Sequence, residues 1–175
     1  MKTVRLTRIV TRRGLLIGAL CSLAIVASVW SAPTGGPVPL AVFDTFSISS
    51  DPPPEGFDVS FKGVFTSIIG GNVASGTSRM DVKRMPGGDI VHCKFTWVRS
   101  DGEGTLVLAS VCVLSQGHGT WHVEEGTGVY KNFKAVGTET FGRLPPGGAF
   151  TDFERFAGIG TFEKHGDDDE DGDNQ

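Results

Sequence analysis

A two-residue alternation of apolar and polar side chains recurs along this chain and limits its fold more than any other feature. In one segment, the apolar residues are Val91, Cys93, Phe95 and Trp97. Such alternation is typical of a β-strand with one buried face, whereas an amphipathic helix has an apolar period near 3.6 residues. No stretch after residue 31 sustains a helical period, and the segment 106–114 is apolar on both faces, as in a doubly covered strand. The chain is therefore predicted to be all-β.

Turn-forming residues divide these alternating segments. The chain has 25 glycines and nine prolines, many of them clustered between apolar runs. The predicted strands lie near residues 39–49, 56–66, 72–84, 89–99, 105–115, 119–124, 134–142 and 149–163. Eight short strands with no helix long enough for a crossover predict an antiparallel barrel or sandwich.

The hairpin of the fourth and fifth predicted strands suggests a cysteine pair. If its turn is residues 101–104, Ser100 pairs with Thr105, and the same register places Cys93 opposite Cys112. Directly opposed residues lie about 4.5–5.5 Å apart, which a disulfide can span. We predict a Cys93–Cys112 disulfide that closes a loop of roughly 20 residues and adds on the order of 3 kcal/mol. The alternative is two buried free thiols.

The first 31 residues have the order of a secretory signal. Residues 1–13 are basic, residues 14–29 are apolar, and Ser31 provides a small residue for cleavage. The alternative is a membrane anchor, but this apolar run is shorter than the roughly 20 residues that span a bilayer. Residues 11–16 also resemble a twin-arginine motif, so both export routes stay open. We expect a secreted, periplasmic or otherwise extracytoplasmic protein with no stable membrane anchor after cleavage.

The charges lie mainly at the two ends of the chain. The net charge is −4, but the first 31 residues hold five basic groups and no acid, and the last nine hold six acids. The nearly balanced middle argues against a nucleic-acid-binding surface, and its length is that of one domain. The predicted organisation is a signal peptide at 1–31, a disordered leader at 32–38, a β-barrel domain at 39–164 and an acidic disordered tail at 165–175.

Two groups of residues raise the question of a metal site. Asp167, Asp169 and Asp171 match the start of a calcium loop, but the bidentate acid of the twelfth position would fall after Gln175. We therefore predict a solvated tail. His118 and His122 share one face of a predicted strand, with His92 on a nearby strand. They form no recognisable ligand spacing, so we predict strand-face histidines and no metal. The sequence also lacks the motifs of serine and zinc hydrolases.

The segment 121–138 resembles a known family. Its Gly126-Thr-Gly128-Val-Tyr130 sequence, with a later glycine at Gly137, resembles the G-T-G-x-[FY]-x…G pattern of dirigent and allene oxide cyclase-like barrels. Gly126 and Gly128 tolerate the positive φ of a tight turn, while Tyr130 and Phe133 supply apolar mass to close a barrel end.

The resemblance implies an eight-stranded antiparallel, calycin-like β-barrel with an apolar cavity, often assembled as homodimers or homotrimers. Members of these families steer the cyclisation or coupling of reactive apolar intermediates. The protein supplies shape and excludes water, and no cofactor is required.

Polar residues on apolar strand faces are the candidate catalytic groups. Asp44, Glu139 and Arg99 each share parity with apolar neighbours, and a carboxylate in an apolar cavity has a raised pKa that suits acid–base chemistry. Tyr130 is a candidate hydrogen-bond donor to a ligand. Apolar ligand contacts are assigned to Trp97, Phe95 and Phe61. The alternative is that the acids reach solvent at strand ends and that Tyr130 only closes the barrel.

Two functions follow from these expectations. The first is an exported barrel that binds a small apolar molecule in its lumen and guides an isomerisation or cyclisation. The second is a non-catalytic secreted barrel that binds a ligand or a protein. The lumen distinguishes them, because a lumen filled by side chains such as Trp97 and Phe156 excludes small-molecule chemistry. An open cavity lined by Asp44, Glu139 or Arg99 favours the first.

Overall fold

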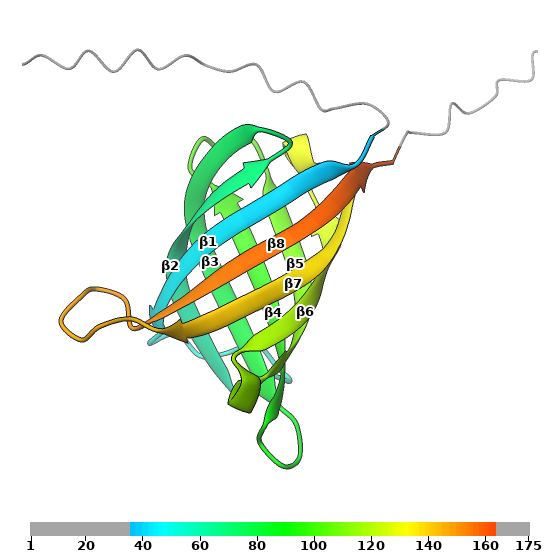
Figure 1. Cartoon of the computed structure of the whole chain (residues 1–175). Coiled ribbons are helices and arrows are strands. Elements are labelled where there is room, and N and C mark those ends of the chain that lie inside the picture. Colours follow the sequence, from blue (N-terminus) through cyan, green and yellow to red (C-terminus); the bar gives the residue numbers. More distant parts are fainter. Residues whose placement is uncertain (1–35, 164–175) are drawn as a thin grey trace, which may run out of the picture.

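Eight strands pair in chain order and close into a barrel, because β8 pairs back onto β1 (Figure 1). The computed structural model describes residues 36–163. The strands are β1 (Val38–Ile48), β2 (Val59–Ile69), β3 (Asn72–Arg84), β4 (Ile90–Arg99), β5 (Thr105–Val113), β6 (His118–Gly126), β7 (Phe133–Arg143) and β8 (Asp152–Phe162). All eight pairings are antiparallel, so the predicted all-β antiparallel barrel is confirmed. The predicted signal peptide and acidic tail lie outside the described residues.

Most strand boundaries agree with the predicted ones, but β2 and β8 each begin three residues later than expected. The Pro52–Pro54 run and a turn at Gly56, with a φ of 86°, keep Phe57 and Asp58 in the loop. The Phe57 amide donates to the Pro54 carbonyl, 3.1 Å away, inside that loop. Between residues 36 and 163, no helix is long and apolar enough to cross a membrane.

The alternating residues point into the barrel and form a single core, as the sequence pattern predicts. Trp121 of β6 enters this core where the next two strands of the sheet, β7 and β8, carry glycine. A Cβ atom at Gly137 or Gly158 would lie 2.6 or 2.5 Å from the Trp121 ring. The indole therefore fits only because these two positions have no side chain, and its Nε1 donates to the Thr138 carbonyl at 2.9 Å.

The register predicted for the β4–β5 hairpin is wrong by two residues. Cys93 lies opposite Ser110, and Cys112 lies opposite Val91. The cysteines are therefore diagonal neighbours, and both are buried free thiols, so the predicted disulfide is not present. The physical reason is the turn, where Ser100 donates to the Ser75 carbonyl of β3 at 2.9 Å and does not pair with Thr105. A shift of two residues keeps every side chain on its predicted face.

One end of the barrel is closed by the segment that resembles the family pattern. β6 ends at Gly126, a 3₁₀ turn covers Gly128–Tyr130, and Tyr130 and Phe133 are buried at this end. Gly128 has the expected positive φ of 57°, and a Cβ there would lie 1.9 Å from the Glu103 carbonyl oxygen. Gly126 has no positive φ, contrary to expectation. A glycine is required at position 126 because the backbone of Tyr130 passes close to it, and a Cβ there would lie 2.1 Å from the Tyr130 carbonyl oxygen.

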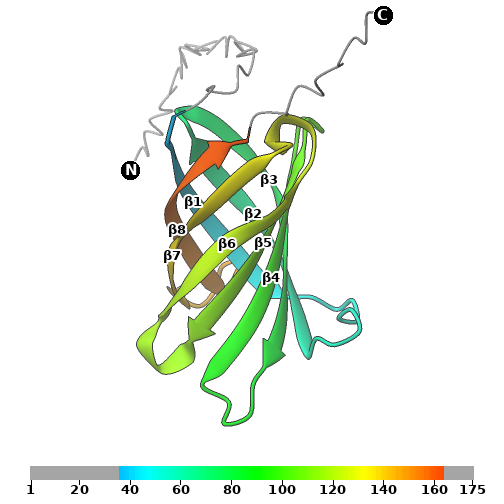
Figure 2. The same cartoon turned by 90° about the vertical axis from the view of Figure 1, so that its right-hand side faces the viewer.

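The two barrel ends differ in their connections (Figure 2). The closed end carries the connections after β2, β4 and β6, together with the start of β1 and the end of β8. The opposite end carries the connections after β1, β3, β5 and β7, and those after β1 and β7 are the two longest of the barrel. We call this opposite end the mouth.

Candidate functional site

The mouth of the barrel contains a cavity of about 470 Å³. Its wall comes from residues near the mouth ends of β2, β3, β4, β5, β7 and β8. Apolar side chains form most of this wall, including Val59, Phe61, Met80, Val82, Val91 and Phe141. The polar and charged wall residues are Arg84, Cys93, Cys112, Arg143, Asp152 and Glu154. A cavity of this size and composition is typical of a small-molecule site.

A cluster of aromatic rings fills the middle of the lumen beyond the cavity. Phe156 contacts Phe95 and Trp97 edge to face, with ring centroids 5.0 Å apart in both pairs. Trp121 packs against the same Phe156 ring at 6.2 Å. Phe95 and Trp97, two of the candidate ligand contacts, thus lie in the buried core, and only Phe61 of the apolar candidates lines the cavity. The cavity is therefore open at the mouth alone.

Glu154 of β8 is the buried acid on the cavity wall, and the sequence reasoning did not select it. Its side chain is 6% exposed, and its Oε2 atom accepts no hydrogen bond from the residues that the structure describes. Burial raises the pKa of Glu154 well above its usual value, and the neighbouring Glu139 raises it further. Glu154 shares parity with Phe156, which is the signal that could have identified it. Its charged sequence neighbours Asp152 and Arg155 obscured that signal.

Asp44 of β1 lies directly opposite Glu154 in the β1–β8 register, but deeper in the wall. It is fully buried, and it accepts hydrogen bonds from Trp97 Nε1 at 2.8 Å and Ser78 Oγ at 2.7 Å. Burial raises the pKa of Asp44 to about 7, although these two donors act in the opposite direction. The candidate acid Asp44 is thus held by the core and does not line the cavity.

Glu139 of β7 is fully buried behind the cavity wall. Its Oε1 atom accepts hydrogen bonds from Ser110 Oγ and from Cys112 Sγ, the latter at 2.8 Å, while Oε2 has no partner among residues 36–163. Burial raises the pKa of Glu139, and the two donors oppose that rise. The contact with Cys93 and burial raise the pKa of Cys112, so its thiol keeps the proton that it donates. Cys112 also lines the cavity, so its thiol links the buried Glu139 carboxylate to the cavity wall.

Arg99 and Tyr130 lie at the closed end, away from the three acids. Arg99 pairs with Asp101 and, at 3.1 Å, with Glu103, and its guanidinium lies 5.8 Å from the Tyr130 ring centroid. The ion pair with Arg99 lowers the pKa of Asp101 to about 2. The structure therefore separates the candidate residues into an acidic group near the mouth and an Arg99–Tyr130 group that closes the other end.

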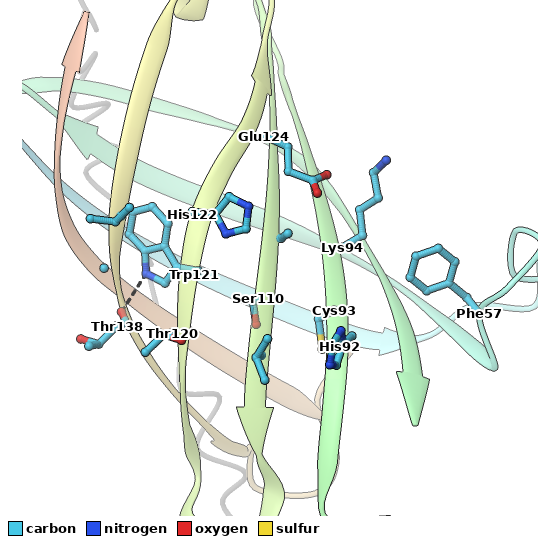
Figure 3. Close-up of a pocket in the computed structure, with 14 residues that line it drawn as sticks. Phe57, His92, Cys93, Lys94, Ser110, Thr120, Trp121, His122, Glu124 and Thr138 are labelled. Carbon is cyan, nitrogen blue, oxygen red and sulfur yellow. Dashed lines mark hydrogen bonds between the residues drawn. The ribbon is translucent and has the colours of Figure 1, made fainter. Parts of the chain in front are cut away.

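A second hollow, of about 990 Å³, lies on the outer face of β4, β5, β6 and β7 (Figure 3). His92, Lys94, His122 and Glu124 project onto it and are exposed. Within residues 36–163, no three His, Cys, Asp or Glu side chains gather closely enough to hold a metal ion. This hollow is open to solvent and presents no unpartnered buried acid, so we assign the candidate site to the mouth cavity.

The molecule is a closed eight-stranded antiparallel β-barrel with a lumen open at one end and the buried acids Asp44, Glu139 and Glu154 in its wall. No protein-family model matches the chain, and no curated protein sequence matches it. Two solved structures of pterocarpan synthase dirigent proteins are similar to it, at 13% and 12% sequence identity, each with a TM-score of 0.49. They cover 77% and 78% of this chain, and 99% and 91% of their own chains.

A pyocyanin demethylase structure is also similar, with 16% identity and a TM-score of 0.41 over 70% of this chain and 99% of the other. At such identities a likeness concerns the fold alone, and function has to be argued from the site.

Proposed function

We propose that this barrel binds a small apolar molecule in its mouth cavity and guides an isomerisation or cyclisation of that molecule. In this proposal Glu154 acts as the proton or hydrogen-bond donor. The observation that carries it is the buried Oε2 atom of Glu154, which lacks a partner in the described part of the chain and belongs to the wall of an otherwise apolar cavity.

The state of Glu154 fits this role. Burial raises its pKa and so favours the protonated carboxyl group, which can present an O–H donor without a negative charge. A ligand carbonyl, epoxide or similar oxygen at that position would satisfy a donor that the protein itself leaves free. As negative charge develops on that oxygen during a rearrangement, the hydrogen bond strengthens.

The surrounding wall supports a reaction that depends on shape. Apolar side chains exclude water, and the aromatic cluster around Phe156 gives the cavity a fixed floor. A reactive molecule held against this floor has few conformations, which favours one product over others. Asp44 and Glu139 act from behind the wall as positioning residues, since both lie near Glu154 and influence its pKa.

The second candidate function is a non-catalytic carrier that uses the same cavity. The hydrogen bonds that Asp44 and Glu139 accept from core side chains favour this alternative, because such acids also serve to order a core. We also propose that the protein acts after export, which the basic and apolar order of residues 1–31 supports. Assembly into homodimers or homotrimers is a further proposal that rests on the sequence resemblance.

Fluorescence titration with the neutral ketone 6-propionyl-2-(dimethylamino)naphthalene tests the site, because a hydrogen bond to its carbonyl shifts its emission to the red. We expect the ketone to bind the wild-type barrel with red-shifted emission. Glu154→Leu removes the donor, so emission should shift to the blue while binding persists. Val59→Trp fills the cavity and should abolish binding, and Glu124→Gln on the outer face is the matched control. Unchanged emission in Glu154→Leu, with circular dichroism showing a folded barrel, would contradict the role of Glu154.

A further inference from the structure

Two arginines line the mouth cavity, and the proposed reaction does not use them. Arg84 stands at the end of β3 and Arg143 at the end of β7, four strands apart around an eight-stranded barrel. They therefore approach the mouth from opposite walls. Neither guanidinium forms an ion pair with any of residues 36–163. Both side chains are exposed, so they stay hydrated and available to a ligand.

The other charged groups of the cavity wall leave an excess of positive charge. Asp152 pairs with Arg143 in the β7–β8 register and accepts a hydrogen bond from Thr151 Oγ1 at 2.7 Å. Glu154 lies deeper and is buried, and burial raises its pKa, which disfavours its negatively charged form. Two guanidinium groups against the half-buried carboxylate of Asp152 give the cavity a net charge of about +1.

We propose that the natural ligand of the cavity is an organic monoanion, an apolar body that carries one carboxylate or similar acidic group. This inference rests on the proposed function and names its class of ligand. The anionic group pairs with Arg84 and Arg143 at the rim, while the apolar body fills the cavity. An oxygen at the far end of the body reaches Glu154. Charge at one end and a hydrogen bond at the other fix the direction in which the molecule enters.

A pair of probes with the same apolar body separates charge from burial. N-phenyl-1-naphthylamine is neutral, and 8-anilinonaphthalene-1-sulfonate adds one negative charge to that body. Wild-type protein should bind the sulfonate more tightly than the amine. The double variant Arg84→Gln/Arg143→Gln should weaken sulfonate binding about tenfold and change amine binding less than twofold. The sulfonate preference should also decline with added salt.

Matched variants control for net charge and for folding. Lys83→Gln/Lys131→Gln removes the same two charges from exposed positions outside the cavity and should leave both affinities unchanged. Arg84→Lys/Arg143→Lys keeps the charges and should retain the preference for the sulfonate. Circular dichroism and thermal unfolding establish that each variant is folded.

Two results would overturn the inference in distinguishable ways. Equal affinities for both probes in wild-type and rim variants would refute the anionic ligand and leave the proposed apolar site intact. If the cavity-filling variants Val59→Trp and Val82→Phe, both folded, change neither affinity, the probes bind elsewhere, and the proposed function fails together with this inference.

Discussion

Replacing Asp44 by asparagine should remove a large part of the pH dependence of stability. The carboxyl group is fully buried and its pKa is raised from 3.8 to about 7. Asparagine has nearly the same shape and cannot ionise. Its carbonyl oxygen can accept from Trp97 Nε1, while its amide donates to Ser78 Oγ, because a hydroxyl both donates and accepts.

The magnitude follows from proton linkage. Between pH 3.8 and about 7, Asp44 releases its proton in the unfolded chain but keeps it in the folded barrel. The unfolded state then binds fewer protons, so the free energy of unfolding declines as the pH rises and levels off above pH 7. The total decline from Asp44 is about 4 kcal/mol, of which about 3 kcal/mol falls between pH 5 and pH 8.

Urea unfolding at pH 5 and pH 8 measures this contribution directly. The wild-type protein should lose about 3 kcal/mol more of its unfolding free energy over that interval than Asp44→Asn loses. The contributions of Glu139 and Glu154 are present in both proteins and largely cancel in the comparison. Glu124→Gln on the outer face should behave as the wild type does. If wild type and Asp44→Asn show the same pH dependence within about 0.5 kcal/mol, the reasoning about burial of Asp44 is wrong.

Three further perturbations test the packing and the hydrogen bonds of the barrel. Gly128→Ala should destabilise by about 2 kcal/mol or more in thermal unfolding, because it combines a positive φ with a clash against the Glu103 carbonyl. Gly102→Ala shares the positive φ but has open space, so an equal loss there would disprove the clash. Phe156→Ala should cost about 3–5 kcal/mol in urea unfolding and enlarge the cavity toward the lumen, whereas half-exposed Phe43→Ala should cost far less. Cys112→Ala removes a donor to Glu139, so carboxyl NMR should show its pKa rise further, and an unchanged pKa would argue against the thiol contact.

The overall fold could be predicted from the sequence because it depends on short-range patterns. Strand alternation requires only that each inward residue be apolar, and turn residues mark where a strand ends. The register of β4 and β5 could not be derived in this way. Ser100 forms its hydrogen bond with Ser75 of β3, and a two-stranded model of the hairpin contains no such partner.

The site could be predicted only in part, for a similar reason. Asp44 and Glu139 were identified as acids on an inward face, and both are buried. Whether an inward acid reaches a cavity depends on how the aromatic rings divide the lumen, and that division is a property of the packed barrel. From the sequence, Phe95 and Trp97 were expected to contact a ligand, but both pack against Phe156 in the core. Glu154 was not selected from the sequence, and it lies on the cavity wall.

The first and last strands have a practical consequence for handling this protein. β1 begins at Val38 and β8 ends at Phe162, and both points lie at the end opposite the mouth (Figures 1 and 2). A tether attached just before β1 or just after β8 would therefore emerge on the side away from the cavity. Immobilising the barrel through either point on a sensor surface would orient every copy with its opening toward the solution. Access for small molecules would then be the same as for the free protein.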